Sequence, residues 1–374
     1  MITASLISTG ILYRYGQKVS ALLQDSIYAA AYGAIGISIG ILISSVVGFL
    51  HILFVFLIYR KSSGRKEQLK NQDRGQHIFR MLMGTALPFM IYALLGRGIL
   101  LLDGILFIRQ KEGTADTVLL WGNYYGKCLP VLGIMILFCI LFHEGYIRRI
   151  IYFMDREEFR MARERMAEFM QHIILISFPV AVFTAVFSEN LLNLFFKGNN
   201  ASLAQAVATG SILIPLFAIS YACAELLVRM RKMRYVLSLE GIAAITHGIL
   251  MIVLQQSMGD SLFGILIAQI VPLAVFTVLS FILVLRGIQY RIDYMRRLAF
   301  PAATAAAAGL VCLAFNKLLS SFAGSTVSMI ICIPVGIVIY IILLLILKAI
   351  SEDEIQKLPL AGMILFIGKL TRLL

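Results

Sequence analysis

The residues of this chain that could carry chemistry are a few ionisable side chains inside long apolar runs. Arg97 lies in the segment Leu94-Leu-Gly-Arg-Gly98, and Asp103 follows six residues later. A charge inside a membrane-spanning run is costly and is therefore a candidate functional residue. Arg97 is far from both ends of its run, and its neighbouring glycines leave room for a bulky group. A guanidinium there suits an anionic ligand such as a diphosphate, through bidentate hydrogen bonds.

Asp103 is the second candidate on the same run. Six residues along a helix rotate the side chain by about 240°, so Asp103 and Arg97 should not share a face. Asp103 also lies nearer the end that we assign below to the outside. It is therefore either a further substrate contact or a residue with a purely structural role.

Glu240 and His247 form the third candidate. They are seven residues apart and should lie on one face of their helix. Such a pair could relay protons in an ion-coupled transporter. Because Glu240 lies within a turn or two of the end of its run, a simple hydrogen bond between helices is the alternative.

Signatures of catalysis and metal binding are missing from the sequence. The segment Gly122-Asn-Tyr-Tyr-Gly126-Lys127-Cys128 is one residue too short for a phosphate-binding loop and lacks its Ser or Thr. The histidines fall on separate elements without ligand spacing, at His51, His77, His143, His172 and His247. We expect no metal, no cofactor and no enzymatic activity.

The elements that must position these residues are membrane spans. Hydrophobic residues make up 60% of the chain and charged residues 14%, with a mean hydropathy of +0.89, which excludes a soluble domain. The formal charge of +13 is spread between the apolar runs, so membrane orientation explains it better than nucleic-acid binding does. The bilayer is the expected partner.

The apolar runs predict an all-α, polytopic transmembrane bundle with nine full crossings. The predicted crossings are 27–59, 82–108, 119–147, 169–196, 203–228, 235–256, 261–285, 298–316 and 326–347. The apolar piece 1–13 is about half the necessary length, so we interpret it as the tail of a further, partial helix. Residues 155–168 mix acids and bases at helical spacing and predict a surface helix.

The connectors alternate between arginine-rich and arginine-poor. The basic ones are 60–80, 148–165, 229–234, 286–297 and 348–372. Since basic residues are retained in the cytoplasm, these connectors and the C-terminus are predicted to be cytoplasmic.

Several short motifs, in their order and spacing, resemble a known family. They are Tyr28-Ala-Ala-Ala-Tyr-Gly-Ala34, Ala86-Leu-Pro88 followed by Leu94-Leu-Gly-Arg97, Gly122-Asn-Tyr-Tyr-Gly126, Ser177-Phe-Pro179, Leu194-Phe-Phe-Lys-Gly198 and Glu352-Asp-Glu-Ile-Gln-Lys-Leu-Pro359. This order is similar to the polysaccharide-biosynthesis, stage V sporulation protein B-like flippases of the multidrug/oligosaccharidyl-lipid/polysaccharide exporter superfamily. The family pattern is not followed at 142–146 and 224–228.

The resemblance implies a lobed organisation. Residues 1–59 would be the end of a first lobe, 60–81 a cytoplasmic linker, 82–285 a second six-helix lobe, 286–350 a C-terminal helix pair, and 351–374 a cytoplasmic amphipathic tail. Most of a first lobe would be absent, so a missing lobe or a second copy is an expected partner.

The resemblance further implies a location in a bacterial inner membrane and alternating access around a basic cavity. The cargo would be an anionic lipid-linked sugar diphosphate used in cell-wall or polysaccharide synthesis, contacted by Arg97 and by Asp103, and the last two spans would form a groove for its lipid tail. Two alternatives remain. One is a multidrug exporter of the same superfamily, which should have more acidic residues in its cavity, and the other is a truncated membrane scaffold that moves nothing.

Overall fold

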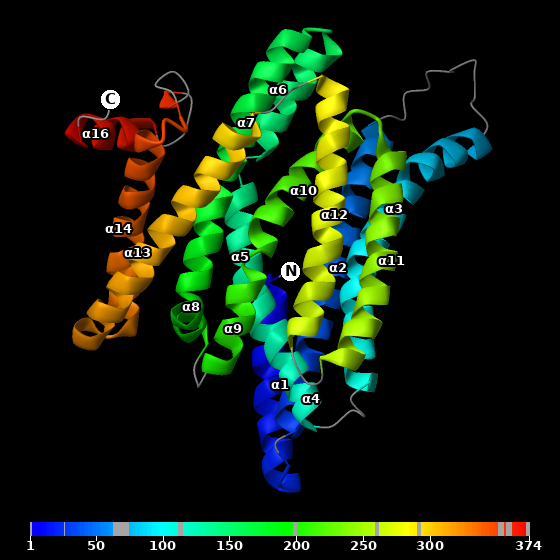
Figure 1. The fold of residues 1–374 in the computed structure, drawn as a ribbon. Coiled ribbons are helices and arrows are strands. Elements are labelled where there is room, and N and C mark those ends of the chain that lie inside the picture. Colours follow the sequence, from blue (N-terminus) through cyan, green and yellow to red (C-terminus); the bar gives the residue numbers. More distant parts are fainter. Residues whose placement is uncertain are drawn as a thin grey trace. The chain divides into compact units, whose positions relative to one another are not determined.

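The structure is a computed structural model in which every described element is helical. It describes residues 2–25, 27–62, 75–110, 115–141, 143–196, 200–258, 262–289, 293–350, 355–356 and 361–371. Within these residues nine helical segments are long and apolar enough to cross a membrane. They are Ile27–Ile58, Phe79–Arg109, Asp116–Ile140, Phe159–Val186, Ala201–Arg229, Met233–Ser257, Leu262–Ile288, Met295–Phe322 and Ser325–Ile346. The predicted all-α, multi-pass membrane architecture is confirmed (Figure 1).

The chain divides into two compact units, and the first, Met1–Ile78, is a pair of packed helices. Helix α1 spans Ile2–Leu23 and α2 spans Ile27–Ser62. The Ser8 hydroxyl donates to the Gly36 carbonyl at 2.6 Å. A Cβ added at Gly36 would lie 2.6 Å from the Cα of Thr9, and one at Gly40 would collide with the backbone at Ser5. The glycines therefore allow the two backbones to touch.

Helix α1 is longer than the half-length apolar piece that the sequence indicated. It continues beyond Tyr13 to Leu23, and Arg14 and Lys18 are exposed on it. A charge on the outer face does not end a helix, because Arg and Lys are good helix formers. The length of the apolar run therefore underestimated the length of the helix.

The second unit, Phe79–Leu374, contains the remaining helices. Its first half comprises α3 (Gly75–Gln110, which begins just before the unit), α4 (Ala115–Asn123), the π-helix η1 (Tyr124–Cys128), α5 (Leu129–Ile140), α6 (His143–Asp155), α7 (Phe159–Val186) and α8 (Ser188–Phe195). Its second half comprises α9 (Ala201–Gly210), α10 (Leu213–Arg229), α11 (Met233–Ser257), α12 (Leu262–Ile288), the π-helix η2 (Met295–Ala299), α13 (Phe300–Ala323), α14 (Ser325–Ile346) and α16 (Ala361–Thr371). Several single crossings are thus built from two or three consecutive helices.

Two element boundaries differ from those predicted. The crossing predicted to reach residue 147 ends at Ile140, and α6 follows as a separate amphipathic helix whose buried face carries His143, Ile147 and Ile150. The surface helix predicted at 155–168 is instead the first turns of α7, which begins at Phe159 and continues into its crossing. Charge alone does not mark helix ends, since helices extend beyond the hydrocarbon core.

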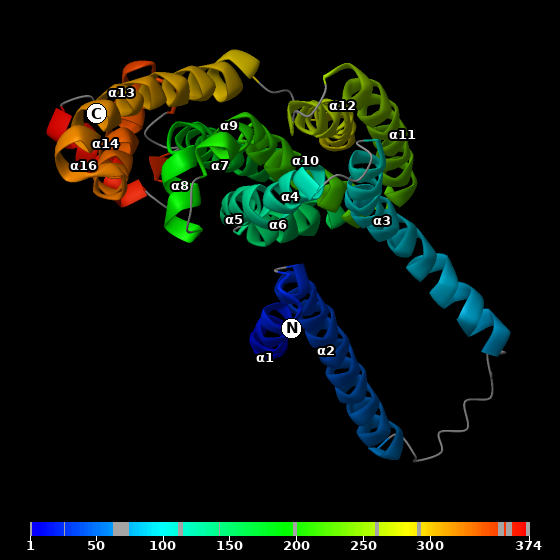
Figure 2. The same ribbon diagram turned by 90° about the horizontal axis from the view of Figure 1, so that it is seen from below.

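The core of the second unit lies where α5, α7 and α10 pack together. Phe169, Leu132 and Ile214 are among its fully buried side chains. Figure 2 shows α7 and α10 between two outer groups, with α13, α14 and α16 on one side and α3, α11 and α12 on the other.

Helices α13 and α14 form a hairpin that packs against α7. Gly324, with φ of +79°, joins the two helices in a backbone conformation that favours glycine. Gly309 on α13 lies against Val182, and Gly336 on α14 lies against Phe183. All five cysteines of the chain are unpaired and buried within the protein.

Prolines inside the helices leave backbone carbonyls without their usual helical donor. A proline has no N–H, so the carbonyl four residues before it loses its partner. Pro179 in α7 leaves the Leu175 carbonyl without a helical N–H donor. The Tyr340 hydroxyl of α14 donates to that carbonyl instead, at 3.3 Å. The C-terminal hairpin is therefore attached to α7 at a group that a proline made available.

Candidate functional site

Helices α3 and α11 lie side by side in Figures 1 and 2 and meet at two levels. At one level, Glu240 Oε1 lies 3.8 Å from the position of a Cβ at Gly96. At the other, His247 of α11 contacts Asp103 of α3. Gly96 and Asp103 are seven residues, or two turns, apart on α3, and Glu240 and His247 are equally far apart on α11. The two helices therefore run parallel and keep one register across both contacts.

The imidazole of His247 is held between two oxygen atoms. Its Nε2 lies 2.6 Å from Asp103 Oδ1, and its Nδ1 lies 2.7 Å from the carbonyl oxygen of Ala268 on α12. Asp103 is 1% exposed and His247 is 6% exposed. The contact is therefore a short interaction between two ionisable groups shielded from solvent.

Pro272 explains why the Ala268 carbonyl is available. Pro272 lies inside α12, four residues after Ala268, and supplies no N–H to that carbonyl. His247 takes the place of the missing donor. Because a carbonyl oxygen only accepts, Nδ1 must carry a hydrogen.

This fixed tautomer determines what the contact with Asp103 requires. With Nδ1 protonated, the contact between Nε2 and Oδ1 needs one more hydrogen. That hydrogen belongs either to an imidazolium facing a carboxylate or to a neutral imidazole facing a carboxylic acid. The contact therefore holds one shared proton, and without it two acceptors would face each other.

Two further residues continue the network. Gln269 Nε2 donates to Asp103 Oδ2 at 3.4 Å, and Gln269 Oε1 accepts a hydrogen bond from the Tyr124 hydroxyl at 2.8 Å. Tyr124 is fully buried and opens the π-helix η1 between α4 and α5. Short π-helical segments widen a helix locally and are frequent at functional sites. Four crossings thus contribute to one buried polar chain.

The network lies within the apolar part of the spans. Asp103 is six residues, about 9 Å, from the end of its crossing at Arg109, and His247 is ten residues, about 15 Å, from Ser257. Buried titratable groups at such depth are costly unless they are paired. Among the described residues no group of three or more His, Cys, Asp or Glu side chains could hold a metal ion.

The predicted site residues are distributed as follows. Asp103 and His247 are brought together, on different helices. Glu240 is on the same face of α11 as His247, but it is beside Gly96 and is not hydrogen-bonded to His247 in the described structure. Arg97 follows Gly96 on α3, and its side chain lies outside the described residues.

Sequence reasoning missed Tyr124, Gln269 and the Ala268 carbonyl. Gln269 is a polar residue inside an apolar run, and Pro272 follows it by three positions. Together they could have indicated a polar contact on α12. Tyr124 belongs to a segment that the sequence presents as an incomplete phosphate loop and as a family motif, and neither interpretation indicates a role for its hydroxyl.

Comparison with known proteins gives one informative similarity. No family model matches the chain, and no solved structure matches it. The chain is similar to Stage V sporulation protein B of Bacillus subtilis (strain 168), with 22% identity over 339 residues that cover 88% of this chain and 65% of the relative. The chain therefore spans just under two thirds of that relative's length, and the similar region includes most of the crossings described above.

Proposed function

We propose that this protein is a membrane transporter of the flippase type, driven by proton transfer at the Asp103–His247 pair. The observation that carries the proposal is the short contact between these two buried side chains, Nε2 to Oδ1, in the interior of a multi-pass helical unit. The distant similarity to Stage V sporulation protein B supports a transporter in general terms.

The pair could couple a proton to helix movement for an electrostatic reason. When the shared proton leaves, Nε2 and Oδ1 repel each other, and α3 and α11 are no longer held together at this level. Restoring the proton restores the contact. Because Ala268 and Gln269 also belong to the network, α12 would follow the same change. Alternating access needs such a movement between packed helices.

The proposed cargo is an anionic lipid-linked sugar diphosphate, a precursor of cell-wall or other polysaccharide, moved across a bacterial cytoplasmic membrane. The support is the sequence position of Arg97 inside a crossing, one residue beyond the Gly96–Glu240 contact. A guanidinium can bind a diphosphate through paired hydrogen bonds. On this proposal Arg97→Ala abolishes flipping and Arg97→Lys restores it only in part, because an ammonium lacks the bidentate geometry.

The experiment is a flipping assay on the chain reconstituted in lipid vesicles, with a fluorescent lipid-linked sugar diphosphate and an imposed pH gradient. Asp103→Asn is the decisive variant. An asparagine amide can donate to Nε2 and so imitates the protonated acid permanently. We expect gradient-driven flipping to fall at least about tenfold, while the yield of folded protein remains near that of the wild type. Asp116→Asn, at an exposed position on α4, is the control and should flip normally.

The other outcomes separate the alternatives. Gradient-driven flipping by Asp103→Asn at the wild-type rate would remove the pair from the mechanism. Transport of a cationic dye without flipping would favour the multidrug exporter. If the wild-type chain moves neither probe, the scaffold alternative stands.

A further inference from the structure

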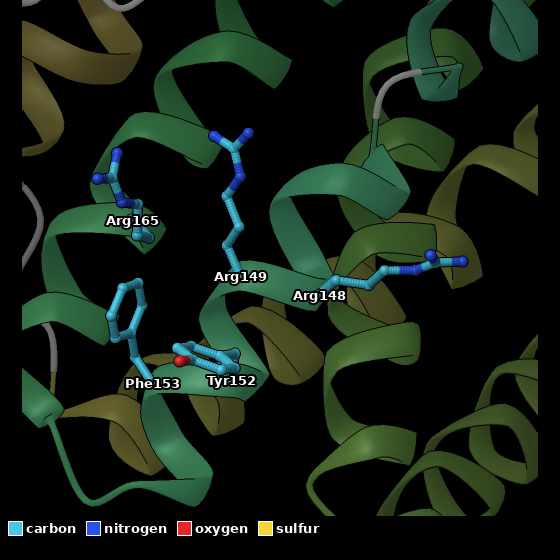
Figure 3. Close-up of a pocket in the computed structure, with 5 residues that line it drawn as sticks. All are labelled: Arg148, Arg149, Tyr152, Phe153 and Arg165. Atoms are coloured by element: carbon cyan, nitrogen blue, oxygen red, sulfur yellow. The ribbon is translucent and has the colours of Figure 1, made fainter.

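A basic pocket lies beside α6, away from the network described above. It has a volume of about 460 Å³ and is lined by Arg148, Arg149, Tyr152, Phe153 and Arg165 (Figure 3). The first four come from α6 and Arg165 comes from α7. The lining contains three guanidinium groups and no acidic side chain. Its chemistry therefore selects an anion.

The helical period of α6 explains how the pocket forms. His143, Ile147 and Ile150 point into the core, so Arg148, Arg149 and Tyr152 fall on the outer side of the helix. Helix α7 packs against α6 and supplies Arg165 from its second turn. The pocket is thus a product of the amphipathic pattern of α6 and of its packing against α7.

The three arginines differ in how their charges are compensated. Arg148 pairs with Glu144 at 2.6 Å, and Arg165 pairs with Glu168 at 2.7 Å. Arg149 is exposed and has no hydrogen-bond or ion-pair partner among the described residues. In Figure 3 the side chains of Arg149 and Arg165 extend on the same side of the pocket, whereas that of Arg148 points away from them. Arg149 is therefore the cation available to a ligand.

The position of the pocket indicates which anion it takes. Four of its five lining residues lie between the end of one crossing at Ile140 and the start of the next at Phe159, and Arg165 lies in the second turn of that next crossing. Aromatic rings at such a boundary lie at the level of lipid headgroups, and basic pockets there attract anionic lipids. The rings of Tyr152 and Phe153 provide an apolar wall beside the guanidinium groups. A lipid presents an anionic phosphate and an apolar chain together, as this lining requires.

We propose that this pocket binds the headgroup phosphate of an anionic phospholipid, with Arg149 as the main contact and Arg165 as the second. The site is distinct from the Asp103–His247 network and does not depend on the proposed transport function. Bound lipid would bridge α6 and α7 and so stabilise the fold of this part of the unit.

The test is thermal unfolding of the purified full chain in detergent during titration with phosphatidylglycerol, and with phosphatidylcholine of the same acyl chains. We expect phosphatidylglycerol to raise the unfolding temperature at lower concentration than phosphatidylcholine does. In Arg149→Ala the half-saturating concentration of phosphatidylglycerol should rise about five- to tenfold, the loss expected for one interfacial cation. Without lipid the variant should unfold near the wild-type temperature, because Arg149 is exposed.

Arg160→Ala is the matched control. Arg160 is on the first turn of α7, has an 88% exposed side chain and does not line the pocket, so its removal lowers the net charge equally. For Arg160→Ala, the half-saturating concentration of phosphatidylglycerol should stay within about twofold of the wild-type value. An equal loss in both variants would overturn the proposal in favour of diffuse charge attraction. Equal binding of the two lipids, or the same stabilisation by inorganic phosphate at equal concentration, would also overturn it.

Discussion

At the scale of single residues, the tautomer of His247 is set by Pro272, which is not one of its hydrogen-bond partners in the described structure. Pro272 removes a donor from α12, the Ala268 carbonyl accepts from His247 instead, and the remaining ring nitrogen must share its hydrogen with Asp103. A histidine without this neighbour could exchange tautomers, and its Nε2–H could still donate to the carboxylate after the pair had lost a proton.

The Tyr124 hydroxyl gives a prediction at this scale. It donates to Gln269 Oε1, whose amide donates to Asp103, so Tyr124→Phe leaves a partly buried side-chain carbonyl without its partner. We expect a loss of about 1–3 kcal/mol in the free energy of unfolding. Denaturant unfolding in detergent micelles measures it. The adjacent Tyr125→Phe is the control, since Tyr125 is 53% exposed and its change should stay within about 0.5 kcal/mol. Equal losses would mean that the hydroxyl is not part of the network.

The candidate residues illustrate what the sequence could and could not predict. A rotation of about 240° predicts that Asp103 and Arg97 do not share a face of their helix, but it says nothing about which other helix faces Asp103. The period of seven places Glu240 and His247 on one face, yet each contacts α3 at a different level. Contacts between helices depend on tertiary packing, which helix periodicity does not contain.

At the scale of elements, prolines determine where helices exchange hydrogen bonds. Two carbonyls that lie four residues before a proline, those of Leu175 and Ala268, accept from side chains of other helices. Membrane helices tolerate proline when neighbouring groups satisfy the released carbonyl. Here each released carbonyl joins a specific pair of helices, α7 with α14 and α12 with α11.

A double-mutant cycle tests this interpretation. In the wild-type background, Tyr340→Phe should lower the free energy of unfolding by about 1 kcal/mol, because the Leu175 carbonyl loses its donor. After Pro179→Ala the restored N–H satisfies that carbonyl within α7, so the same Tyr340→Phe change should cost much less. Unfolding of the wild type, both single variants and the double variant gives the coupling free energy, which we expect near 1 kcal/mol. If the changes in unfolding free energy of the two single variants add to within about 0.3 kcal/mol of the change in the double variant, the interpretation is wrong.

Element boundaries were the weakest part of the sequence-based prediction. The apolar runs identified all nine crossings that the described residues contain, because burial in lipid requires about 20 apolar residues each. They did not reveal the break before His143, the start of α7 at Phe159 or the π-helix at Tyr124. These features depend on local backbone geometry and on amphipathic packing within the protein.

At the scale of the whole molecule, the alternation of basic connectors predicts orientation. The arginine-rich connectors and the C-terminus should face the cytoplasm. We expect a fluorescent protein fused after Leu374 to fluoresce, because it would fold in the cytoplasm. Alkaline phosphatase fused after Ser257 should be active, because it would be exported. The reversed pattern would invert the predicted topology, and with it the side of the membrane that the arginine pocket faces.

The burial of every cysteine has a practical consequence for following motion. Thiol reagents need an accessible thiolate, and a side chain enclosed by protein does not offer one. Nitroxide labels should therefore attach only to cysteines placed deliberately on the surface, with no native residue replaced beforehand. Electron paramagnetic resonance on the otherwise unaltered protein could then test whether α3 and α11 separate, as proposed, when the proton shared by Asp103 and His247 is lost.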